Sequence, residues 1–347
     1  MKVLVAMSGG VDSSVAAALL AAAGHQVTGA TLRLWGGPSD SGCCSVADVD
    51  DARRVAQQLD LPHHVFNMAE QFDEAVVAPY VGAHAAGRTP NPCIECNRHV
   101  KFGSLLRRAV RLGFDALATG HHARVVADAG RFRLLRGADA AKDQSYVLSM
   151  LGQDALARVV LPVGELTKAE VRRRAAGLGL RTAAKPDSQD VCFIHRAEGR
   201  RGFLAGRMAL HPGTVVDGDG EPVGSVDAVE LVTVGQRRGL GLGGSRRYAV
   251  AVDVPRRRVT VSGVAAVREV PLDPSSLTWV DRPLPPGAAA VAQVGAHGRP
   301  VSCTFGGAGV AFDQPQRPVA PGQTVALYHA GDPDAVAGAG VCAAPGW

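Results

Sequence analysis

A glycine- and serine-rich segment stands where a short apolar run gives way to an alanine-rich one. It reads Met7-Ser8-Gly9-Gly10-Val11-Asp12-Ser13-Ser14. A strand, a glycine turn and a helix start in that order leave free backbone N–H groups at a helix N-terminus, where the helix dipole also favours anions. The serines add hydroxyl donors, and the glycines let a phosphate approach the backbone. We therefore predict a phosphate loop at residues 7–14.

Two common nucleotide-binding loops do not fit this segment. A Walker A loop needs a lysine that reaches the β and γ phosphates, and a dinucleotide loop needs the pattern Gly-x-Gly-x-x-Gly. Neither pattern occurs between residues 7 and 14. The phosphate loop is thus predicted to be of another type, and the alternative is an ordinary strand-to-helix turn capped by serine or aspartate.

A proline-rich loop carries two cysteines ahead of a basic segment. Residues 87–97 contain Cys93 and Cys96, and a helix is expected to begin near Arg98. A cysteine with a pKa of about 8.5 is mostly protonated at neutral pH, so a nucleophilic cysteine needs a helix N-terminus or nearby cations. Cys96 is predicted to have both. The Cys-x-x-Cys spacing also suits a redox pair or half a zinc site, but the sequence lacks a second pair to complete a zinc site.

A third candidate cysteine, Cys192, follows a polar stretch, residues 185–190. Its neighbours Val191 and Phe193 favour a buried structural cysteine, which is the usual fate of a lone thiol. The polar stretch is a poor core element, and it favours an exposed loop at an active site. We therefore predict that Cys192 takes part in the chemistry.

The histidines carry less information. His121 and His122 follow a predicted strand end beside the nucleotide site, so contact with a base is expected there, whereas His25, His63 and His64 are expected at the surface or in packing.

The composition is that of an ordinary folded chain. A length of 347 residues with 46% hydrophobic and 20% charged residues predicts two or three domains. The apolar stretch at residues 15–23 is too short to cross a bilayer and lacks the basic segment and cleavage site of a signal peptide. Seven cysteines at irregular spacings do not suggest a secreted disulfide framework. We expect a cytoplasmic protein without a membrane partner.

The basic residues gather in two segments. These contain Arg98, His99, Lys101, Arg107, Arg108 and Arg111, and then Lys168, Arg172, Arg173 and Arg174. Because each neutralised phosphate releases counterions, such clusters fit a polyanionic partner. Only five of the 37 basic residues are lysine, so arginine is the common cation of this chain. A solvated helix face is therefore the alternative for either cluster.

Residues 1 to about 180 alternate short apolar runs with helical periodicity. Strands are predicted at residues 3–7, 27–34, 64–68 and 116–119, and helices at 11–23, 47–59, 72–81, 98–112 and 168–178. This alternation predicts an α/β fold with a doubly wound parallel sheet. Ligands of such sheets lie beyond the carboxyl ends of the strands, where the phosphate loop is placed.

Short β-branched runs between glycine and proline turns replace the helical pattern after about residue 205. The clearest runs are residues 223–226, 248–254, 258–261, 289–294 and 324–328. They predict two small β-rich domains, the second of them barrel-like. Proline-rich stretches at 271–274 and 283–286 mark their join, so the expected domains are 1–204, 205–270 and 271–347.

The ordered set of motifs resembles the bacterial tRNA-specific 2-thiouridylases. These belong to the ATP pyrophosphatases, which split ATP to AMP and pyrophosphate and share a loop of the form Ser-Gly-Gly-x-Asp-Ser. The resemblance extends from residue 1 to about 265 and is carried by residues 8–13, 87–92, 96–97, 118–121, 142–146, 187–194 and 235–240. It implies an adenine nucleotide alpha hydrolase-like sheet in the first domain.

The resemblance implies an enzyme that inserts sulfur at the wobble uridine, U34, of the tRNAs for Lys, Glu and Gln. ATP, assisted by Mg²⁺, would adenylate the C2 oxygen of uracil, which is otherwise a poor leaving group. A persulfide sulfur would then attack C2 and expel AMP. A cysteine desulfurase or another persulfide donor is the implied partner.

The resemblance also assigns roles to particular residues. Cys192 would carry the persulfide, and Cys96 would be the nucleophile that completes the transfer or releases the sulfur, with a disulfide between them during turnover. ATP would be held by Ala6, Met7, Ser8, Gly9, Gly10, Val11, Asp12 and Ser13, with Leu32 and Gly120 at the adenosine. The tRNA would meet His121, Lys142, Asp143 and Gln144. No resident metal site is implied.

Two positions depart from the family pattern. Many members have aspartate where this chain has Cys93, so an acid–base or positioning role is not carried over to that position. An Arg-Tyr-Arg segment that members place against tRNA is replaced around residues 295–297, which leaves His297 and Arg299 as substitutes.

Three alternatives stay open from the sequence. An ATP pyrophosphatase that activates a small carboxylate or carbonyl for attack by ammonia would not need paired thiols. A nucleotide-binding RNA chaperone would not need them either. An iron–sulfur-dependent thiolation would use Cys93, Cys96 and Cys192 as cluster ligands.

Overall fold

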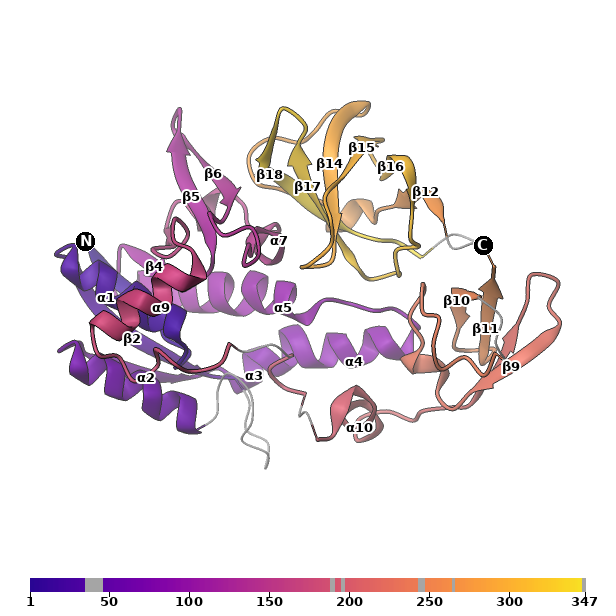
Figure 1. The fold of residues 1–347 in the computed structure, drawn as a ribbon, viewed down its shortest axis with the longest axis horizontal. Coiled ribbons are helices and arrows are strands. Elements are labelled where there is room, and N and C mark those ends of the chain that lie inside the picture. The colour runs from indigo at the N-terminus through magenta and orange to yellow at the C-terminus, as the bar shows by residue number, and fades with distance from the viewer. Residues whose placement is uncertain (35–45, 188–190, 195–196, 243–246, 264–265, 345–347) are drawn as a thin grey trace.

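The computed structural model describes residues 1–34, 46–187, 191–194, 197–242, 247–263 and 266–344 (Figure 1). Its first part is built on five parallel strands in the order β3-β2-β1-β4-β7. They are β1 (Lys2–Ala6), β2 (Gln26–Arg33), β3 (His63–Asn67), β4 (Ala116–Ala118) and β7 (Val159–Val160). The predicted doubly wound parallel sheet is confirmed.

Helices cover both faces of this sheet. One face packs against α1 (Val11–Ala22), α2 (Val46–Gln58) and α9 (Lys168–Gly177). The other carries α3 (Ala69–Phe72), η1 (Asp73–Val77), α4 (Ala78–Ala85), α5 (Pro92–Glu95), η2 (Cys96–Leu105) and α6 (Leu106–Arg111), of which η1 and η2 are π-helical. After the exposed Lys2, strand β1 is apolar because it is buried on both sides: Val3 and Val5 enter the first core and Leu4 the second.

The sequence placed the start of one helix too late. A helix was expected near Arg98, after a loop with both cysteines, but a continuous helical run begins at Pro92 and ends at Arg111. The side chain of Asn91 accepts a hydrogen bond from the Cys93 N–H at 3.1 Å, and Pro92 suits the first helical position. Cys93 and Cys96 therefore lie on the helical run and not ahead of it.

A hairpin of β5 (Ala123–Asp128) and β6 (Arg131–Arg136) rises from the first part and has no counterpart in the sequence prediction. Short helices α7 (Ser145–Leu148), α8 (Gln153–Leu156) and α10 (Gly199–Ala205) follow along the chain.

Two β-rich parts complete the chain, as predicted. The middle sheet has the order β10-β11-β8-β9, with β8 (Gly213–Val216), β9 (Pro222–Val226), the 3-10 turn η3 (Val229–Leu231), β10 (Tyr248–Asp253) and β11 (Arg258–Ser262). The last part contains β12 (Val267–Pro271), η4 (Pro274–Ser276), β13 (Thr278–Trp279), β14 (Ala288–Val294), β15 (Val301–Phe305), β16 (Gly309–Gln316), β17 (Thr324–His329) and β18 (Asp332–Val341).

The last part and the hairpin of the first form one sheet, ordered β12-β16-β15-β14-β17-β18-β6-β5, and lie side by side in Figure 1. Arg136 of β6 stacks its guanidinium 3.8 Å from the centroid of the Tyr328 ring and donates to Gln293 at 2.8 Å. The hydroxyls of Ser145 and Tyr328 are hydrogen-bonded at 3.0 Å. These contacts fix the loop after β6, which carries three of the four predicted tRNA residues, Lys142, Asp143 and Gln144. In the described ranges, no helix is both long and apolar enough to cross a membrane.

Candidate nucleotide and sulfur-transfer site

The strand order reverses at β1, whose neighbours are β2 and β4. Ligands of open parallel sheets bind at such a switch point, beyond the carboxyl ends of the strands. The phosphate loop follows β1 at this point, and Gly120 follows β4. A Cβ at Gly120 would lie 2.5 Å from the backbone nitrogen of Ser13, so only glycine lets the two loops approach each other this closely.

The phosphate loop holds its shape through its own hydrogen bonds. Gly9 has a φ of +71°, and a Cβ there would lie 2.2 Å from the carbonyl oxygen of Asp48. The Ser13 hydroxyl accepts from the Ser8 N–H at 3.2 Å and donates to the Gly10 carbonyl at 3.1 Å. Gly10 provides no side-chain cap for α1. The loop therefore presents the start of α1 to an anion.

The other residues expected at the nucleotide line the strand ends. Ala6 ends β1 and is half-buried, whereas Met7 and Val11 are buried in the core beneath the loop. Leu32 lies near the carboxyl end of β2 and is also buried. The structure thus brings these residues to the same edge of the sheet as Gly120.

Asp12 is the centre of a charged network. Lys168 donates to its two carboxylate oxygens at 2.8 and 2.6 Å, and His122 Nε2 donates at 3.1 Å. Burial opposes ionisation of Asp12, but the hydrogen bonds from His122 and Lys168 outweigh burial and lower the pKa of the carboxyl. The loop has no lysine of its own, and Lys168 of α9 supplies that charge from elsewhere in the chain.

Asp187 joins this network to the segment that leads to Cys192. Its carboxylate accepts from Lys168 and Lys142, each at 2.9 Å, and from Arg172 at 2.7 Å. Burial raises the pKa of Asp187, but the bonds from Lys168 and Lys142 prevail and lower this pKa to about 2. Lys168 therefore bridges the phosphate loop and the chain on the way to Cys192.

Lys185 makes a second connection between the same two segments. Its ammonium donates to the Gly9 carbonyl at 2.9 Å, to Asp48 at 2.6 Å and to Asp51 at 2.7 Å. Sequence analysis placed Lys168 in a basic cluster for a polyanionic partner and Lys185 and Asp187 in the polar stretch before Cys192, but it did not connect these three residues with the phosphate loop. The rarity of lysine was the available signal, since three of the five lysines in the chain, Lys142, Lys168 and Lys185, lie in this network.

The pKa of Asp187 predicts where acid weakens the protein. Folding lowers this pKa from 3.8 to about 2, so the ionised carboxylate stabilises the folded state above about pH 4 and this contribution is lost as the pH falls towards 2. Asp187→Asn lacks the contribution at every pH. We expect calorimetry to show a lower Tm for this variant at pH 6 and a shrinking gap to the parent below pH 4. A gap of constant size across this range would contradict the assignment.

The three candidate cysteines lie in different surroundings. Cys93 is exposed on α5, Cys96 is 7% exposed at the start of η2, and Cys192 is half-buried. Cys96 belongs to the core on one face of the sheet, and Cys192 packs against that same core. Phe193 anchors Cys192 there, with its ring centroid 5.6 Å from that of Phe72.

Part of the polar stretch before Cys192 lies outside the described residues, namely Ser188, Gln189 and Asp190, and so do Cys43 and Cys44. The described neighbours Lys185 and Asp187 are held by ion pairs at the phosphate loop. This part of the polar stretch therefore lies beside the phosphate loop.

The residues expected to contact tRNA differ in the hydrogen bonds and ion pairs that they form within the protein. Asp143 accepts from Arg136 at 2.7 Å and from the Ser145 N–H at 2.9 Å, and Gln144 Oε1 accepts from the His122 N–H at 2.8 Å. These two side chains shape their own loop. Lys142 is 40% exposed and is paired with Asp187.

His121 lies against the ring of Phe102 and is hydrogen-bonded to the Thr119 hydroxyl at 2.7 Å. Burial, together with the nearby Lys101, lowers its pKa well below the usual value, so this imidazole is neutral at physiological pH. A neutral ring favours hydrogen bonding or stacking with a base over pairing with a phosphate. His297 and Arg299 are exposed in the last part of the chain.

The second basic cluster is not one solvated face. Lys168 and Arg172 turn towards Asp12 and Asp187, whereas Arg173 lies on the exposed side near Glu170. Half of this cluster therefore serves the nucleotide site.

Within the described ranges, no three His, Cys, Asp or Glu side chains are grouped so that they could hold a metal ion. Cys93, Cys96 and Cys192 are therefore not grouped in this way among the described residues. Mg²⁺ is a different case, because proteins usually hold it by one or two carboxylates together with substrate phosphates.

Family models match three consecutive parts of the chain. Residues 1–196 match a tRNA methyl transferase HUP domain, residues 201–263 a tRNA methyl transferase PRC-barrel domain, and residues 272–342 an aminomethyltransferase beta-barrel domain. These matches agree with one parallel α/β unit followed by two β-rich ones.

Proteins described as tRNA-specific 2-thiouridylase MnmA are similar to nearly the whole chain. The protein of Roseiflexus sp. (strain RS-1) is 45% identical, over 98% of this chain and 98% of its own length. The protein of Thermobifida fusca (strain YX) is 43% identical, over 99% of this chain and 96% of its own length. The protein of Chloroflexus aggregans (strain MD-66 / DSM 9485) is 46% identical, over 94% of this chain and 94% of its own length. Since these relatives are 43–46% identical and the matches cover at least 94% of this chain, the chain belongs to the family of tRNA-specific 2-thiouridylases.

Proposed function

We propose that this chain is a tRNA-uridine 2-sulfurtransferase, which uses ATP to replace the C2 oxygen of uridine by sulfur. The observation that carries the proposal is the bridge from Asp12 of the phosphate loop through Lys168 to Asp187, five residues before Cys192. It joins a nucleotide site to a thiol-bearing segment, as a reaction that couples ATP cleavage to sulfur transfer requires. The amidotransferase-like and chaperone alternatives leave this connection without a purpose.

In the first step, the C2 oxygen of the uracil attacks the α phosphorus of ATP. The bond between the α phosphorus and the bridging oxygen breaks, pyrophosphate leaves, and AMP stays attached to the base. The start of α1 and the Ser8 and Ser13 hydroxyls are suited to hold phosphate oxygens. Lys168, now held between two carboxylates, is placed to compensate the charge that develops on pyrophosphate.

Mg²⁺ fits the residues of this site. Asp12 and Asp187 are oxygen donors at the phosphate loop and share the Lys168 ammonium. These carboxylates would hold the ion together with the phosphates of ATP, and the ion would supply further neutralisation of the phosphate charge.

In the second step, the terminal sulfur of a persulfide on Cys192 attacks C2, and the bond from C2 to the adenylated oxygen breaks, so AMP leaves. The Cys96 thiolate then attacks the Cys192 sulfur and breaks the persulfide S–S bond, which leaves the outer sulfur on C2. A Cys96–Cys192 disulfide results, and a thiol reductant restores both thiols. The proposal thus includes this transient disulfide.

The finer assignments belong to the same proposal. U34 of the tRNAs for Lys, Glu and Gln is the target, a cysteine desulfurase or another persulfide carrier is the sulfur donor, and the site of action is the cytoplasm. His121 and Lys142 contact tRNA, while Asp143 and Gln144 hold their loop in shape for that contact. The domain boundaries 1–204, 205–270 and 271–347 also remain predictions.

One assay tests the proposal against its alternatives. The protein is incubated with ATP, Mg²⁺, a persulfide donor and unmodified tRNA, and AMP, pyrophosphate and 2-thiouridine are measured. We expect AMP and 2-thiouridine in equal amounts, and only when tRNA is present. AMP without tRNA, or with ammonia and a small acceptor, would instead favour the amidotransferase-like reaction.

Cys93 is expected not to carry sulfur. It is exposed on α5, whereas the transfer is assigned to Cys96 and Cys192. A position that takes aspartate in relatives is a poor candidate for an obligatory sulfur carrier. Cys93→Asp should retain 2-thiouridine formation, and Cys93→Ala should weaken it only partly.

Iron analysis of anaerobically purified protein supplies the control for Cys93. Parent and Cys93→Ala proteins should both lack stoichiometric iron and visible absorption. A cluster present in the parent and lost in the variant would overturn the thiol-only mechanism and make Cys93, Cys96 and Cys192 its ligands.

A further inference from the structure

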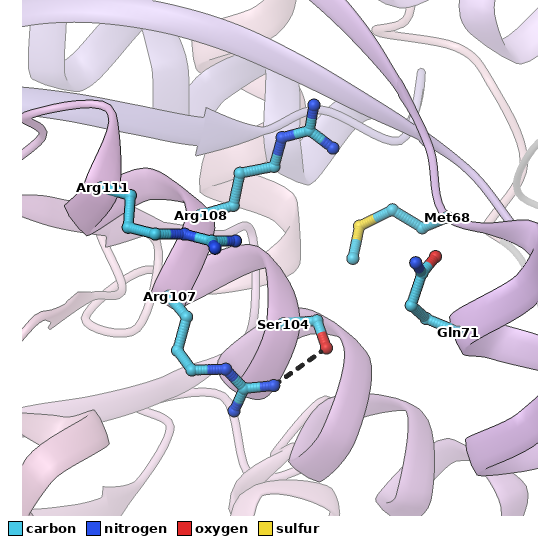
Figure 2. A pocket seen from close by; sticks show the side chains of 6 residues that line it. All are labelled: Met68, Gln71, Ser104, Arg107, Arg108 and Arg111. Atoms are coloured by element: carbon cyan, nitrogen blue, oxygen red, sulfur yellow. Dashed lines mark hydrogen bonds between the residues drawn. The ribbon is translucent and has the colours of Figure 1, made fainter.

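A second concave site lies beside the helical run that begins at α5. It is a pocket of about 170 Å³ between the start of α3 and the η2–α6 run, and it shares no lining residue with the nucleotide site. Figure 2 shows the side chains that line it: Met68, Gln71, Ser104, Arg107, Arg108 and Arg111.

The pocket is strongly positive. Three of its lining side chains are arginines, all exposed, and none is acidic. Arg107 donates to the Ser104 hydroxyl at 3.1 Å, and the Arg108 guanidinium lies 4.4 Å from the centroid of the Phe66 ring. Both contacts orient a guanidinium without neutralising its charge. Across the ranges that the structure describes, neither these two arginines nor Arg111 forms an ion pair with a carboxylate.

Some arginines elsewhere in the molecule are paired with carboxylates. Arg136 of the hairpin is paired with Asp143, and Arg133 is paired with Asp332. The pocket instead concentrates like charges, which repel each other unless an anion joins them. Guanidinium groups present forked N–H donors that match phosphate oxygens, and Gln71 and Ser104 offer neutral donors beside them.

We propose that this pocket binds a backbone phosphate of the tRNA substrate, an inference that rests on the proposed function. Such contacts set the register of a nucleic acid without reading its sequence. They suit an enzyme that must present one uridine to its thiols in several tRNAs. Met68 is buried and forms the apolar wall of the pocket. The polar surface of the pocket therefore consists of its hydrogen-bond donors.

The pocket lies on the same helical run as Cys96. Cys96 begins η2, and Ser104, Arg107, Arg108 and Arg111 follow it on η2 and α6. A phosphate held there would therefore lie beside the element that carries one of the proposed sulfur-transfer thiols.

The test is the salt dependence of tRNA affinity, measured by filter binding with unmodified tRNA between about 50 and 300 mM KCl. Arg107→Ala and Arg108→Ala should each reduce the slope of log affinity against log salt by about one, and the double variant by about two. Arg108→Lys keeps the charge and should keep most of the slope. Arg256→Ala is the matched control, because Arg256 is also exposed but is already paired with Asp253.

The outcomes separate this inference from the proposed function. An unchanged slope in the double variant, with thiolation intact in the parent, overturns the pocket and leaves the function standing. A reduced slope in a protein that forms no AMP with tRNA supports the pocket and overturns the function. A parent protein that does not bind tRNA overturns both.

A second arm distinguishes the sources of the phosphate. We measure the affinity for ATP, and the competition of inorganic phosphate with ATP at constant ionic strength, for the parent and for Arg107→Ala/Arg108→Ala. We expect no change in either. A weaker ATP affinity, or a loss of phosphate competition with an unchanged tRNA slope, would assign the pocket to a free anion and overturn the proposal.

Discussion

Replacing Asp12 by alanine is expected to abolish the release of AMP, with a fall of at least about a hundredfold in the tRNA-dependent rate. Asp12 fixes Lys168 by two hydrogen bonds and His122 by a third, all at the start of α1. Without this carboxylate, Lys168 loses its partner in the phosphate loop and keeps only Asp187, and the site would lose one of the two carboxylates proposed to hold Mg²⁺. Chromatography of α-labelled ATP after incubation with tRNA measures the loss.

Two comparisons make this result specific. Asp50→Ala, on the exposed side of α2, removes a carboxylate that pairs only with the neighbouring Arg53 among the described residues, and it should keep full activity. Lys168→Ala should reproduce the loss seen for Asp12→Ala, because the two side chains act as one unit. ADP and phosphate as the products of the parent enzyme would refute cleavage between the α and β phosphates.

Replacing Cys96 or Cys192 by serine is expected to eliminate 2-thiouridine, a loss of at least about a thousandfold, since a hydroxyl is a far weaker nucleophile than a thiolate at neutral pH. ATP affinity should be unchanged in both variants, because the adenylation step does not use either thiol. Mass spectrometry of nucleosides from digested tRNA measures the product.

The fate of the nucleotide identifies the blocked step. In Cys192→Ser the attack on C2 cannot occur, so one equivalent of pyrophosphate should appear quickly while AMP stays on the tRNA. Cys303→Ala is the control, because this thiol is buried in the last part of the chain and burial raises its pKa to about 11. Near-normal thiolation by Cys192→Ser with a persulfide donor would show that the transfer scheme is wrong.

Local features of the sequence were enough to predict the main architecture. Most strands and helices around the phosphate loop agree with the structure to within a residue or two, because each is encoded by the periodicity and turn residues of its own short stretch. The helix predicted at residues 72–81 is longer in the structure, where helical residues run from Ala69 to Ala85. The late start assigned to the helix with Cys96 was an error of the same local kind, since an Asn91 cap and Pro92 were both visible in the sequence.

The pairing of the β5–β6 hairpin with the sheet of the last part could not be predicted from local sequence features. The hairpin strands are half-buried and rich in arginine, so their pattern resembles a solvated surface. Their burial depends on Tyr328, Gln293 and Asp332, which lie more than 150 residues further along the chain.

The sequence by itself determined the class of fold, the strand–turn–helix around residues 7–14 and the candidate thiols, because a glycine turn between strand and helix and the presence of a cysteine are properties of short segments. Only the tertiary structure decided which cations serve that loop. Lys168 reaches Asp12 across 156 residues of sequence, and Lys185 reaches the Gly9 carbonyl across 176. Charge pairing acts through space and leaves no periodic trace in the chain, so the fold had to bring these residues together before their role could be recognised.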